Sequence, residues 1–194
     1  MPVYLRGLLF LSEQGRQSIS SGKLADFVCV NASQIRKDFS YFGAFGTPGV
    51  GYDIRKLITQ IKRILNLSIF QRAALIGVGN LGSAILAYPG FKMYGFDVAA
   101  AFDNDPRKIG RRINQVSIED ISNLRTLRKR KINLAIIAVP REAAQQTANS
   151  LVKAGIKGIL NFSPFRITVP KKVKVITLDI AMELARLPYY IPTS

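Results

Sequence analysis

The feature that most constrains the fold is a series of five short, continuous apolar runs in the second part of the chain. The runs are AALIGV, VAAAFD, INLAIIAV, GILNF and VKVITL, and all of them follow residue 72. Runs of this length and composition are typical of strands that are buried on both faces of a parallel sheet. Segments 80–88, 118–129 and 141–154 lie between some of these runs and are expected to be helices. Alternating strands and helices predict an α/β domain with a doubly wound parallel sheet.

The first part of the chain has a different pattern, which predicts four short helices over residues 1–65. The first helix is expected to stop at Gly15, and serines at the start of SSGKLADFV are expected to cap the second. The third is expected over 32–42, with Asn31 as N-cap, Gln34 placed for a capping box and Gly43 as the stop. DIRKLITQIKRIL carries one apolar stripe and predicts the fourth. NLSIFQR is expected to be a hinge, so we predict one domain over 1–70 and a second over 71–178.

The net charge of +16 favours a polyanionic partner, although the excess is not confined to one arm or tail. Residues 1–70 hold 9 basic and 4 acidic side chains, and the remainder holds 19 and 8. The single cysteine excludes an internal disulfide and a zinc site built from several cysteines. No apolar run reaches the roughly 18 to 20 residues of a membrane span, and the start predicts an amphipathic helix rather than a signal peptide. These features predict a cytoplasmic protein without a membrane partner.

A glycine-rich turn follows the first apolar run. In LIGVGNLGSAILAY, the glycines at 77, 79 and 82 fit the G-x-G-x-x-G pattern of a Rossmann-type dinucleotide site. Gly77 would make the tight turn, Gly79 would let the backbone approach a pyrophosphate, and Gly82 would let the helix pack on the strand. The run VAAAFD ends at Asp103, 21 residues after Gly82, where a carboxylate would bind the ribose hydroxyls.

These features favour NAD or NADH as the cofactor. Asp103 would repel a phosphate at the ribose 2′ position, although nearby Arg107 and Lys108 would weaken that discrimination. S-adenosylmethionine, or a glycine turn without a ligand, is the alternative interpretation. Ligands of open α/β sheets lie beyond the carboxyl ends of the strands, which adds the ends of two later runs to the site. The residues expected to bind the cofactor are Gly77, Val78, Gly79, Asn80, Leu81, Gly82, Asp103, Val139, Pro140, Asn161 and Phe162.

Residues suited to redox catalysis are scarce. A dehydrogenase needs a proton donor or acceptor beside the nicotinamide, and the chain has no histidine, the commonest choice for that role. No catalytic residue and no metal ligand is therefore assigned. We expect the protein to sense the nucleotide rather than to consume it. The alternative is a small NAD-dependent oxidoreductase with an atypical helical N-terminal domain.

The third predicted helix has two distinct faces. Ile35, Phe39 and Phe42 fall on one side at spacings of four and three, as a core stripe would. The other face is basic, hydroxyl-bearing and partly aromatic, which suits a DNA major groove. The preceding helix and a glycine-rich wing over 43–52 complete a winged helix-turn-helix pattern; the alternative is a solvated basic helix followed by a loop. The residues expected to contact DNA are Ser33, Gln34, Arg36, Lys37, Ser40, Tyr41, Thr47 and Gly49.

Several stretches together closely resemble the Rex family of bacterial redox-sensing transcriptional repressors. They are SQIRKDFSYFGAFGTPGVGY, ALIGVGNLGSA, AFDNDPRKIG, AVPREAAQ and AGIKGILNFSP, in family order and over nearly the whole chain. The resemblance implies a homodimer in which each subunit has a winged-helix domain and a Rossmann domain. It also implies that the protein binds palindromic operator DNA when NADH is scarce and releases it when NADH binds.

The resemblance also implies roles for residues near the C-terminus. Segment 179–194 is implied to be a dimerisation helix exchanged between subunits, and Arg6, Tyr88 and Asp179 are implied to make the contacts that switch the two states. Ile180 stands where many relatives have an aromatic residue at the nicotinamide, which implies weaker discrimination between NADH and NAD⁺. The family normally has a longer basic segment before YLR, which implies fewer phosphate contacts here.

Overall fold

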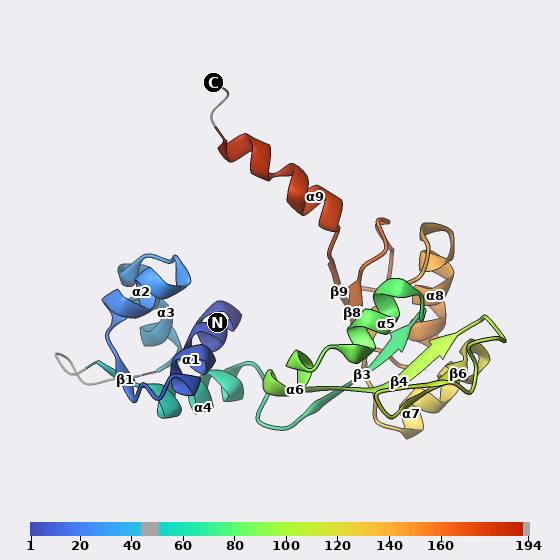
Figure 1. Cartoon of the computed structure of the whole chain (residues 1–194), viewed down its shortest axis with the longest axis horizontal. Coiled ribbons are helices and arrows are strands. Elements are labelled where there is room, and N and C mark those ends of the chain that lie inside the picture. Colours follow the sequence, from blue (N-terminus) through green and yellow to red (C-terminus); the bar gives the residue numbers. More distant parts are fainter. Residues whose placement is uncertain (44–50, 192–194) are drawn as a thin grey trace. The chain divides into compact units, whose positions relative to one another are not determined.

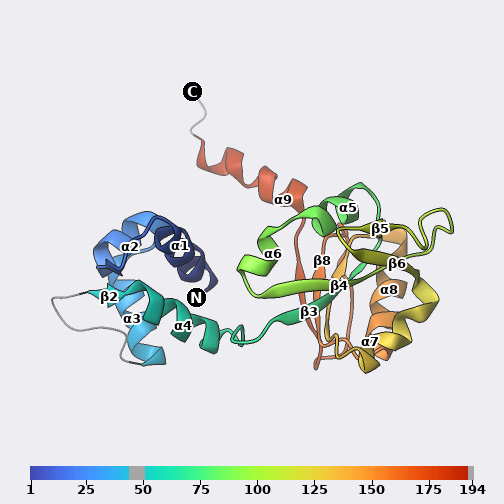
Figure 2. The same cartoon turned by 60° about the horizontal axis from the view of Figure 1, so that its bottom comes forward.

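The structure of the chain is a computed structural model, and it describes residues 1–43 and 51–191. The chain divides into two compact units, Met1–Ile69 and Phe70–Ser194. The division falls inside the stretch NLSIFQR, directly before the first strand of the second unit. Figure 1 and Figure 2 show the helical first unit in blue and cyan and the α/β second unit in green to red.

The first unit consists of helices and a two-stranded antiparallel sheet. Each helix after the first begins at a side-chain cap: Ser20, Asn31 and Asp53 each accept a hydrogen bond from a backbone N–H of the following turn. The apolar faces of the helices meet in one core, in which Leu8 and Ile35 are fully buried. The elements are α1 (Pro2–Glu13), β1 (Ser18–Ile19), α2 (Ser21–Val28), α3 (Ala32–Phe42), β2 (Tyr52–Asp53) and α4 (Ile54–Ile64).

The predicted bounds of α3 are confirmed, but two details of that prediction are wrong. Gln34 does not turn back to form a capping box, because its side-chain amide donates to Asp38 Oδ1 at 2.6 Å, one turn further along the helix. Phe42 is not part of the core stripe, because it lies in the last turn of the helix and is 46% exposed. Ile35 and Phe39 are the residues of α3 that are buried.

The second unit contains a seven-stranded sheet in the order β5-β6-β4-β3-β7-β8-β9. The strands pair in parallel, except that β5 runs antiparallel to β6 at one edge. The chain enters in the middle of the sheet at β3 and winds outward in both directions, which confirms the predicted doubly wound sheet. The strands are β3 (Gln71–Ile76), β4 (Phe96–Asp103), β5 (Arg112–Ile113), β6 (Val116–Asp120), β7 (Leu134–Ile137), β8 (Gly158–Asn161) and β9 (Lys174–Thr177).

Helices cover both faces of this sheet, because successive side chains of its central strand point to two different cores. Ala74 and Ile76 of β3 belong to one core together with α8, whereas Leu75 belongs to the other together with α5. Figure 2 shows α5 and α6 on one side of the sheet and α7 and α8 on the other. The helical segments are α5 (Asn80–Ala87), α6 (Gly90–Met93), the 3-10 turn η1 (Ile121–Arg125), α7 (Thr126–Lys129) and α8 (Arg141–Lys153).

The predicted helix over 118–129 is wrong in its first part. Residues 118–120 belong to β6, in which Ile118 pairs with Ala101 of β4, and the helical segments begin after Asp120. A tight turn precedes this strand: β5 leads into β6 through Asn114 and Gln115, whose φ angles are 45° and 69°. The chain therefore passes from β4 to β6 through a hairpin instead of a crossover helix.

The C-terminal segment forms α9 (Ile180–Ala185) and the 3-10 turn η2 (Leu187–Tyr190). Neither contains a buried residue, and Met182 and Leu184 are 62% and 65% exposed. The segment therefore exposes more apolar surface than is usual for a helix that faces solvent on all sides. Over residues 1–43 and 51–191, the helices are too short or too polar to cross a membrane.

Candidate functional site

The loop between β3 and α5 has the geometry of a nucleotide-binding turn. Gly77 has a φ of +90°, and a Cβ there would lie 2.6 Å from the carbonyl oxygen of Ala138. A Cβ at Gly82 would overlap the carbonyl oxygen of Gly77, so α5 and β3 can approach this closely only with glycine. A Cβ at Gly79 would meet no heavy atom within 4 Å. Packing inside the protein therefore explains the glycines at 77 and 82, whereas Gly79 faces open space.

The beginning of α5 offers backbone groups to an anion. Gly79 is the N-cap of this helix and provides no capping side chain. The first N–H groups of a helix have no partner within the helix, and the helix dipole is positive there, so this end suits a phosphate. Asn80 and Leu81 in the first turn are exposed, while Val78 and Gly82 are buried. The predicted cofactor residues of this loop therefore surround one accessible helix terminus.

Asp103 connects the glycine loop to the end of β4. Its carboxylate accepts hydrogen bonds from the N–H groups of Val78, at 2.7 Å, and Asp105, at 2.9 Å, and from Lys108 Nζ, at 3.0 Å. Burial alone would raise the pKa of Asp103, but these three donors outweigh it and hold the pKa below its usual range. A carboxylate has about four acceptor positions, so about one remains for a ribose hydroxyl.

The end of β7 lies against the same loop. The Ala138 N–H donates to the Ile76 carbonyl at 2.8 Å, which continues the pairing of β7 with β3 up to the glycine turn. A Cβ at Gly77 would lie 2.8 Å from Val139 Cγ1, so Val139 borders the turn directly. Pro140 follows as the exposed N-cap of α8. The structure thus brings the residues predicted at this strand end together with the glycine loop.

Asn161 and Phe162 occupy the end of β8, the next strand of the sheet. The Asn161 side chain is buried and acts within its own loop: its amide donates to the carbonyls of Ser163 and Phe165, and its Oδ1 accepts from the Ser163 N–H. These hydrogen bonds hold the Asn161 side chain within its own loop. The backbone of that loop, rather than the side chain, is therefore the part available to a cofactor. The Ser163 hydroxyl is buried and has no hydrogen-bond partner among the described residues.

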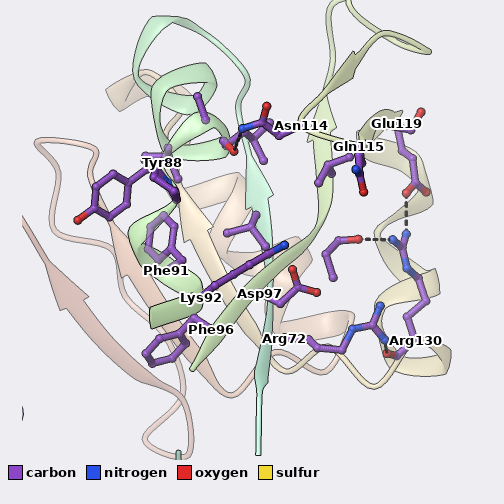
Figure 3. Close-up of a pocket in the computed structure, with 18 residues that line it drawn as sticks. Arg72, Tyr88, Phe91, Lys92, Phe96, Asp97, Asn114, Gln115, Glu119 and Arg130 are labelled. Atoms are coloured by element: carbon purple, nitrogen blue, oxygen red, sulfur yellow. Dashed lines mark hydrogen bonds and ion pairs between the residues drawn. The ribbon is translucent and has the colours of Figure 1, made fainter. Parts of the chain in front are cut away.

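A cavity of about 750 Å³ opens elsewhere, over β4 and between α6 and the β5–β6 turn (Figure 3). Its lining includes Tyr88 on one side and Asn114 and Gln115 on the other. Arg130 is fixed at its edge by Glu119 Oε1, at 2.6 Å. None of the fingerprint glycines lines this cavity, so it is not the nucleotide site. It lies where the hairpin replaces a crossover helix.

In the first unit, α3 presents a cationic and hydroxyl-rich surface to solvent. Arg36 Nη1 donates to Ser21 Oγ at the start of α2, at 3.1 Å, so the two helices of the predicted helix-turn-helix are joined at this surface. Tyr41 is 84% exposed in the last turn. The exposed predicted residues of the helix are Ser33, Gln34, Arg36, Lys37, Ser40 and Tyr41.

Asp38, the acidic residue beside this surface, is held by α1. Tyr4 Oη donates to Asp38 Oδ2 at 2.5 Å, while Gln34 donates to Oδ1. Burial, followed by the Asp38 carboxylate, raises the pKa of Tyr4 to about 12, and the hydrogen bond from Tyr4 lowers the pKa of Asp38. Sequence patterns gave no signal for this contact between residues 34 positions apart. Asp38 therefore secures α1 to α3, and Gln34 already has a partner within the protein.

The remaining predicted residues have varied positions. Thr47 and Gly49 lie outside the described residues. Arg6 is exposed on α1 and borders a small apolar cavity of about 230 Å³. Asp179 is the N-cap of α9, and its carboxylate accepts from two N–H groups of the first turn. Among the residues that the structure describes, His, Cys, Asp and Glu side chains nowhere form a group of three that could hold a metal ion.

Comparison with known families matches both parts of the chain. Residues 1–40 match the family described as "Putative DNA-binding protein N-terminus", and residues 71–165 match the family described as "CoA binding domain". The redox-sensing transcriptional repressor Rex of Chloroflexus aurantiacus is 44% identical over 192 residues, which cover 98% of this chain and 91% of that protein. Rex of Lactobacillus gasseri is 43% identical and covers 98% of this chain and 90% of its own.

Solved structures give a consistent result. The chain is similar to RSP, a Rex-family repressor, in complex with β-NAD⁺ and operator DNA, with a TM-score of 0.90, 37% identity, and coverage of 97% of this chain and 88% of that one. It is also similar to RSP in complex with β-NADH, with a TM-score of 0.87, 35% identity, and coverage of 97% and 89%. With these identities over nearly its full length, the chain belongs to the Rex family of redox-sensing transcriptional repressors.

Proposed function

We propose that this protein is a transcriptional repressor that binds operator DNA through α3 and responds to NAD(H) bound at the glycine loop. The proposal rests on one observation: 97% of the chain is similar to RSP. Crystal structures of RSP contain operator DNA with β-NAD⁺ in one case and β-NADH in another. The protein acts in the bacterial cytoplasm, where operator DNA and the NADH pool are both accessible.

The DNA-binding role rests on the exposed face of α3. Arg36 reaches base edges in the major groove, while Lys37 and the hydroxyls of Ser33, Ser40 and Tyr41 bind phosphates. The hydrogen bond from Arg36 to Ser21 supports this assignment, because it limits the positions of a long side chain before DNA binds.

The nucleotide role rests on the loop at Gly79 and on Asp103. The pyrophosphate lies on the backbone at Gly79, where a Cβ would meet no heavy atom within 4 Å, and at the first turn of α5. Asp103 accepts one ribose hydroxyl with its remaining acceptor position. Lys108 already pairs with Asp103, so the carboxylate repels a 2′-phosphate less strongly than an unpaired one would. We therefore expect NADH to bind better than NADPH, by a moderate factor.

NADH acts by favouring a form of the dimer that binds DNA poorly. A ligand shifts a conformational equilibrium only through different affinities for the two forms. In a dimer, the spacing of the two recognition helices must match half-sites about one helical turn apart, so a change of spacing is enough to lose the operator. Arg6, Tyr88 and Asp179 make the contacts that differ between the two forms.

The exposed apolar surface of α9 joins two copies of the chain. Met182 and Leu184 are unburied within one chain, and apolar surface of this kind marks interaction sites. We predict that a protein ending at Leu178 is a monomer by light scattering and loses binding to a palindromic duplex, while its NADH affinity stays measurable. A dimer of the shortened protein would exclude α9 as the main contact.

The alternative function is a small NAD-dependent oxidoreductase. Tyr88 and Lys92 have a Tyr-x-x-x-Lys spacing that occurs in dehydrogenases, and both line the cavity in Figure 3. That cavity borders the first residues of β4, whereas cofactors of this fold lie at the carboxyl ends of the strands. The position of the pair therefore favours the sensor. Oxidation of NADH in the presence of carbonyl substrates would favour the enzyme.

The test of the proposed function is fluorescence anisotropy of a labelled palindromic duplex at fixed salt, because electrostatic DNA affinity depends strongly on salt. NADH, NAD⁺ and NADPH are titrated separately into the protein–DNA complex. Release by NADH at concentrations well below those needed for NAD⁺ is the expected result. Binding that ignores all three nucleotides would reject the redox signal, and the absence of specific binding would reject the repressor.

A further inference from the structure

The positive charge of the second unit is concentrated in one segment. Residues 125–174 contain twelve Lys and Arg residues and one acidic residue, Glu142. The rest of residues 71–194 contains seven basic and seven acidic residues, so its charges cancel. The full excess of +11 in residues 71–194, which is 19 minus 8, therefore lies between Arg125 and Lys174. Neither the recognition helix nor the glycine loop belongs to this segment.

Five of these cations surround one cavity of about 620 Å³. The cavity lies at the amino-terminal edge of the sheet, where the turns after α7 and α8 lead into β7 and β8 and where the chain enters β9. Backbone hydrogen bonds fix this edge: Lys157 N–H donates to Asn133 O at 2.7 Å, and Lys174 N–H donates to Lys157 O at 2.9 Å. The cations that line the cavity are Arg128, Lys131, Lys153, Lys157 and Lys172.

These five side chains have no acidic counterpart nearby. All five are exposed, and no Asp or Glu lines the cavity. Within residues 1–43 and 51–191, the ion pairs of the second unit involve other cations, namely Arg107, Lys108, Arg130 and Arg186. Like charges gathered around one concave site repel one another, and a bound anion with several negative charges would relieve that repulsion.

Helix termini explain only part of this cluster. Arg128 and Lys153 lie in the last turns of α7 and α8, where the helix dipole favours a cation. Lys131, Lys157 and Lys172 lie outside the helices, in segments that lead into strands. Among the described residues, no side-chain hydrogen bond or ion pair accounts for their convergence on the same cavity.

We propose that this cavity is a second anion site, which binds a small molecule carrying two or more phosphate groups. Its volume is within the range of small-molecule sites, and its cations surround a hollow instead of forming the line that a duplex backbone would need. Buried Ile132, Ile156 and Val173 form an apolar floor. Figure 2 shows α5 and the start of α9 at the carboxyl ends of the strands and α7 at the opposite ends, so this site is separate from the glycine loop.

The experiment is isothermal titration of the full-length protein, saturated with NADH, with inorganic tripolyphosphate at fixed ionic strength. We expect one tripolyphosphate per chain, and about tenfold weaker binding to the variant K157E/K172E. The neutral variant K157Q/K172Q should fall between the two. The control K92E/R111E changes the net charge equally at exposed residues outside the cavity and should bind within about twofold of the wild type.

Three results would overturn the proposal. Equal affinity of K157E/K172E and the wild type would exclude this cavity. An equal loss in K92E/R111E would show that net charge, and not a site, attracts the anion. Binding of a non-operator duplex to this cluster would assign the cluster to nucleic acid if tripolyphosphate does not displace the duplex. NADH affinity, measured in the same variants, reports separately on the glycine loop.

Discussion

At the scale of single residues, Gly79 and Gly82 belong to the same loop but have opposite surroundings. A side chain at Gly79 meets open space, and its φ of −83° suits any residue, so Gly79→Val should lower the free energy of unfolding by less than about 1 kcal/mol. The same side chain would occupy the place of the pyrophosphate, so NADH binding should be lost. Gly82→Ala should instead destabilise the protein by about 3 kcal/mol, because its Cβ overlaps the Gly77 carbonyl.

Thermal unfolding without nucleotide and titration with NADH measure the two effects separately. Operator binding by Gly79→Val should be close to normal, since α3 is unchanged. If Gly79→Val binds NADH normally, the open space beside Gly79 is not the pyrophosphate site.

Asp103 gives a pH-dependent prediction. Its pKa is lowered in the folded protein, so its contribution to stability is present above the unfolded pKa of about 3.9 and is lost as the pH falls through the folded value. Asp103→Asn keeps one carbonyl oxygen for three donors, so at pH 7 it should lower the free energy of unfolding by about 2 kcal/mol. Urea unfolding should show this difference at pH 7 and a smaller one near pH 3.5. A difference that does not change with pH would mean that the Asp103 charge does not stabilise the fold.

At the scale of elements, α3 is expected to carry DNA recognition. Lys37→Ala should weaken operator binding by about 1 kcal/mol and lower the slope of log affinity against log salt by about one. Arg36→Ala should cost about 1–3 kcal/mol if the guanidinium reads a base. NADH affinity should stay near normal in both variants, because the glycine loop belongs to the other unit.

Ser21→Ala is the matched control for Arg36. It removes the hydrogen bond to Arg36 Nη1 and leaves all charges in place. Operator affinity close to the wild type would assign the loss in Arg36→Ala to DNA contacts. Losses of equal size in both variants would assign it to the packing of α2 against α3 instead.

The elements also indicate how far the sequence determines this fold. α3 was predictable because its signals are local: Asn31 caps it, Gly43 ends it, and Ile35 and Phe39 repeat at helical spacing. The error at 118–129 has a physical reason, since Ile118, Ile121, Leu124 and Leu127 recur every three residues and imitate a helical stripe. Pairing of Ile118 with β4 overrides that pattern, and local periodicity carries no information about it.

The turn before β6 was detectable in principle. Asn114 and Gln115 have positive φ angles at two consecutive positions, as in a two-residue hairpin turn, and asparagine tolerates this conformation better than most residues. Gln115 replaces the glycine that would make the signal strong. Of the candidate site, the glycine loop could be predicted because its spacing encodes its geometry. The bond between Tyr4 and Asp38 could not, because it depends on how α1 packs on α3.

At the scale of the whole molecule, the two candidate sites lie in different units, and no residue belongs to both. In the proposed mechanism, the response to NADH therefore comes from the populations of two dimer forms and not from competition for shared side chains. This indirect coupling distinguishes the Rex-type switch from an inhibitor that competes with DNA for the same residues. The coupling can be measured either as the effect of NADH on operator binding or as the effect of operator DNA on NADH binding.

Thermodynamic linkage requires that operator DNA weaken NADH binding by the same factor by which NADH weakens operator binding. A factor of about tenfold would correspond to about 1.4 kcal/mol of coupling. NADH is titrated into the protein alone, with saturating operator duplex and with a scrambled duplex, while anisotropy gives operator affinity with and without NADH. The scrambled duplex should leave NADH affinity unchanged. The operator duplex should also leave the NADH affinity of the protein ending at Leu178 unchanged, because that protein keeps the nucleotide site but no longer binds the operator. Coupling that survives in the shortened protein would mean that exchange of α9 between subunits does not transmit the signal, whereas unequal factors would mean that the two titrations do not measure the same equilibrium.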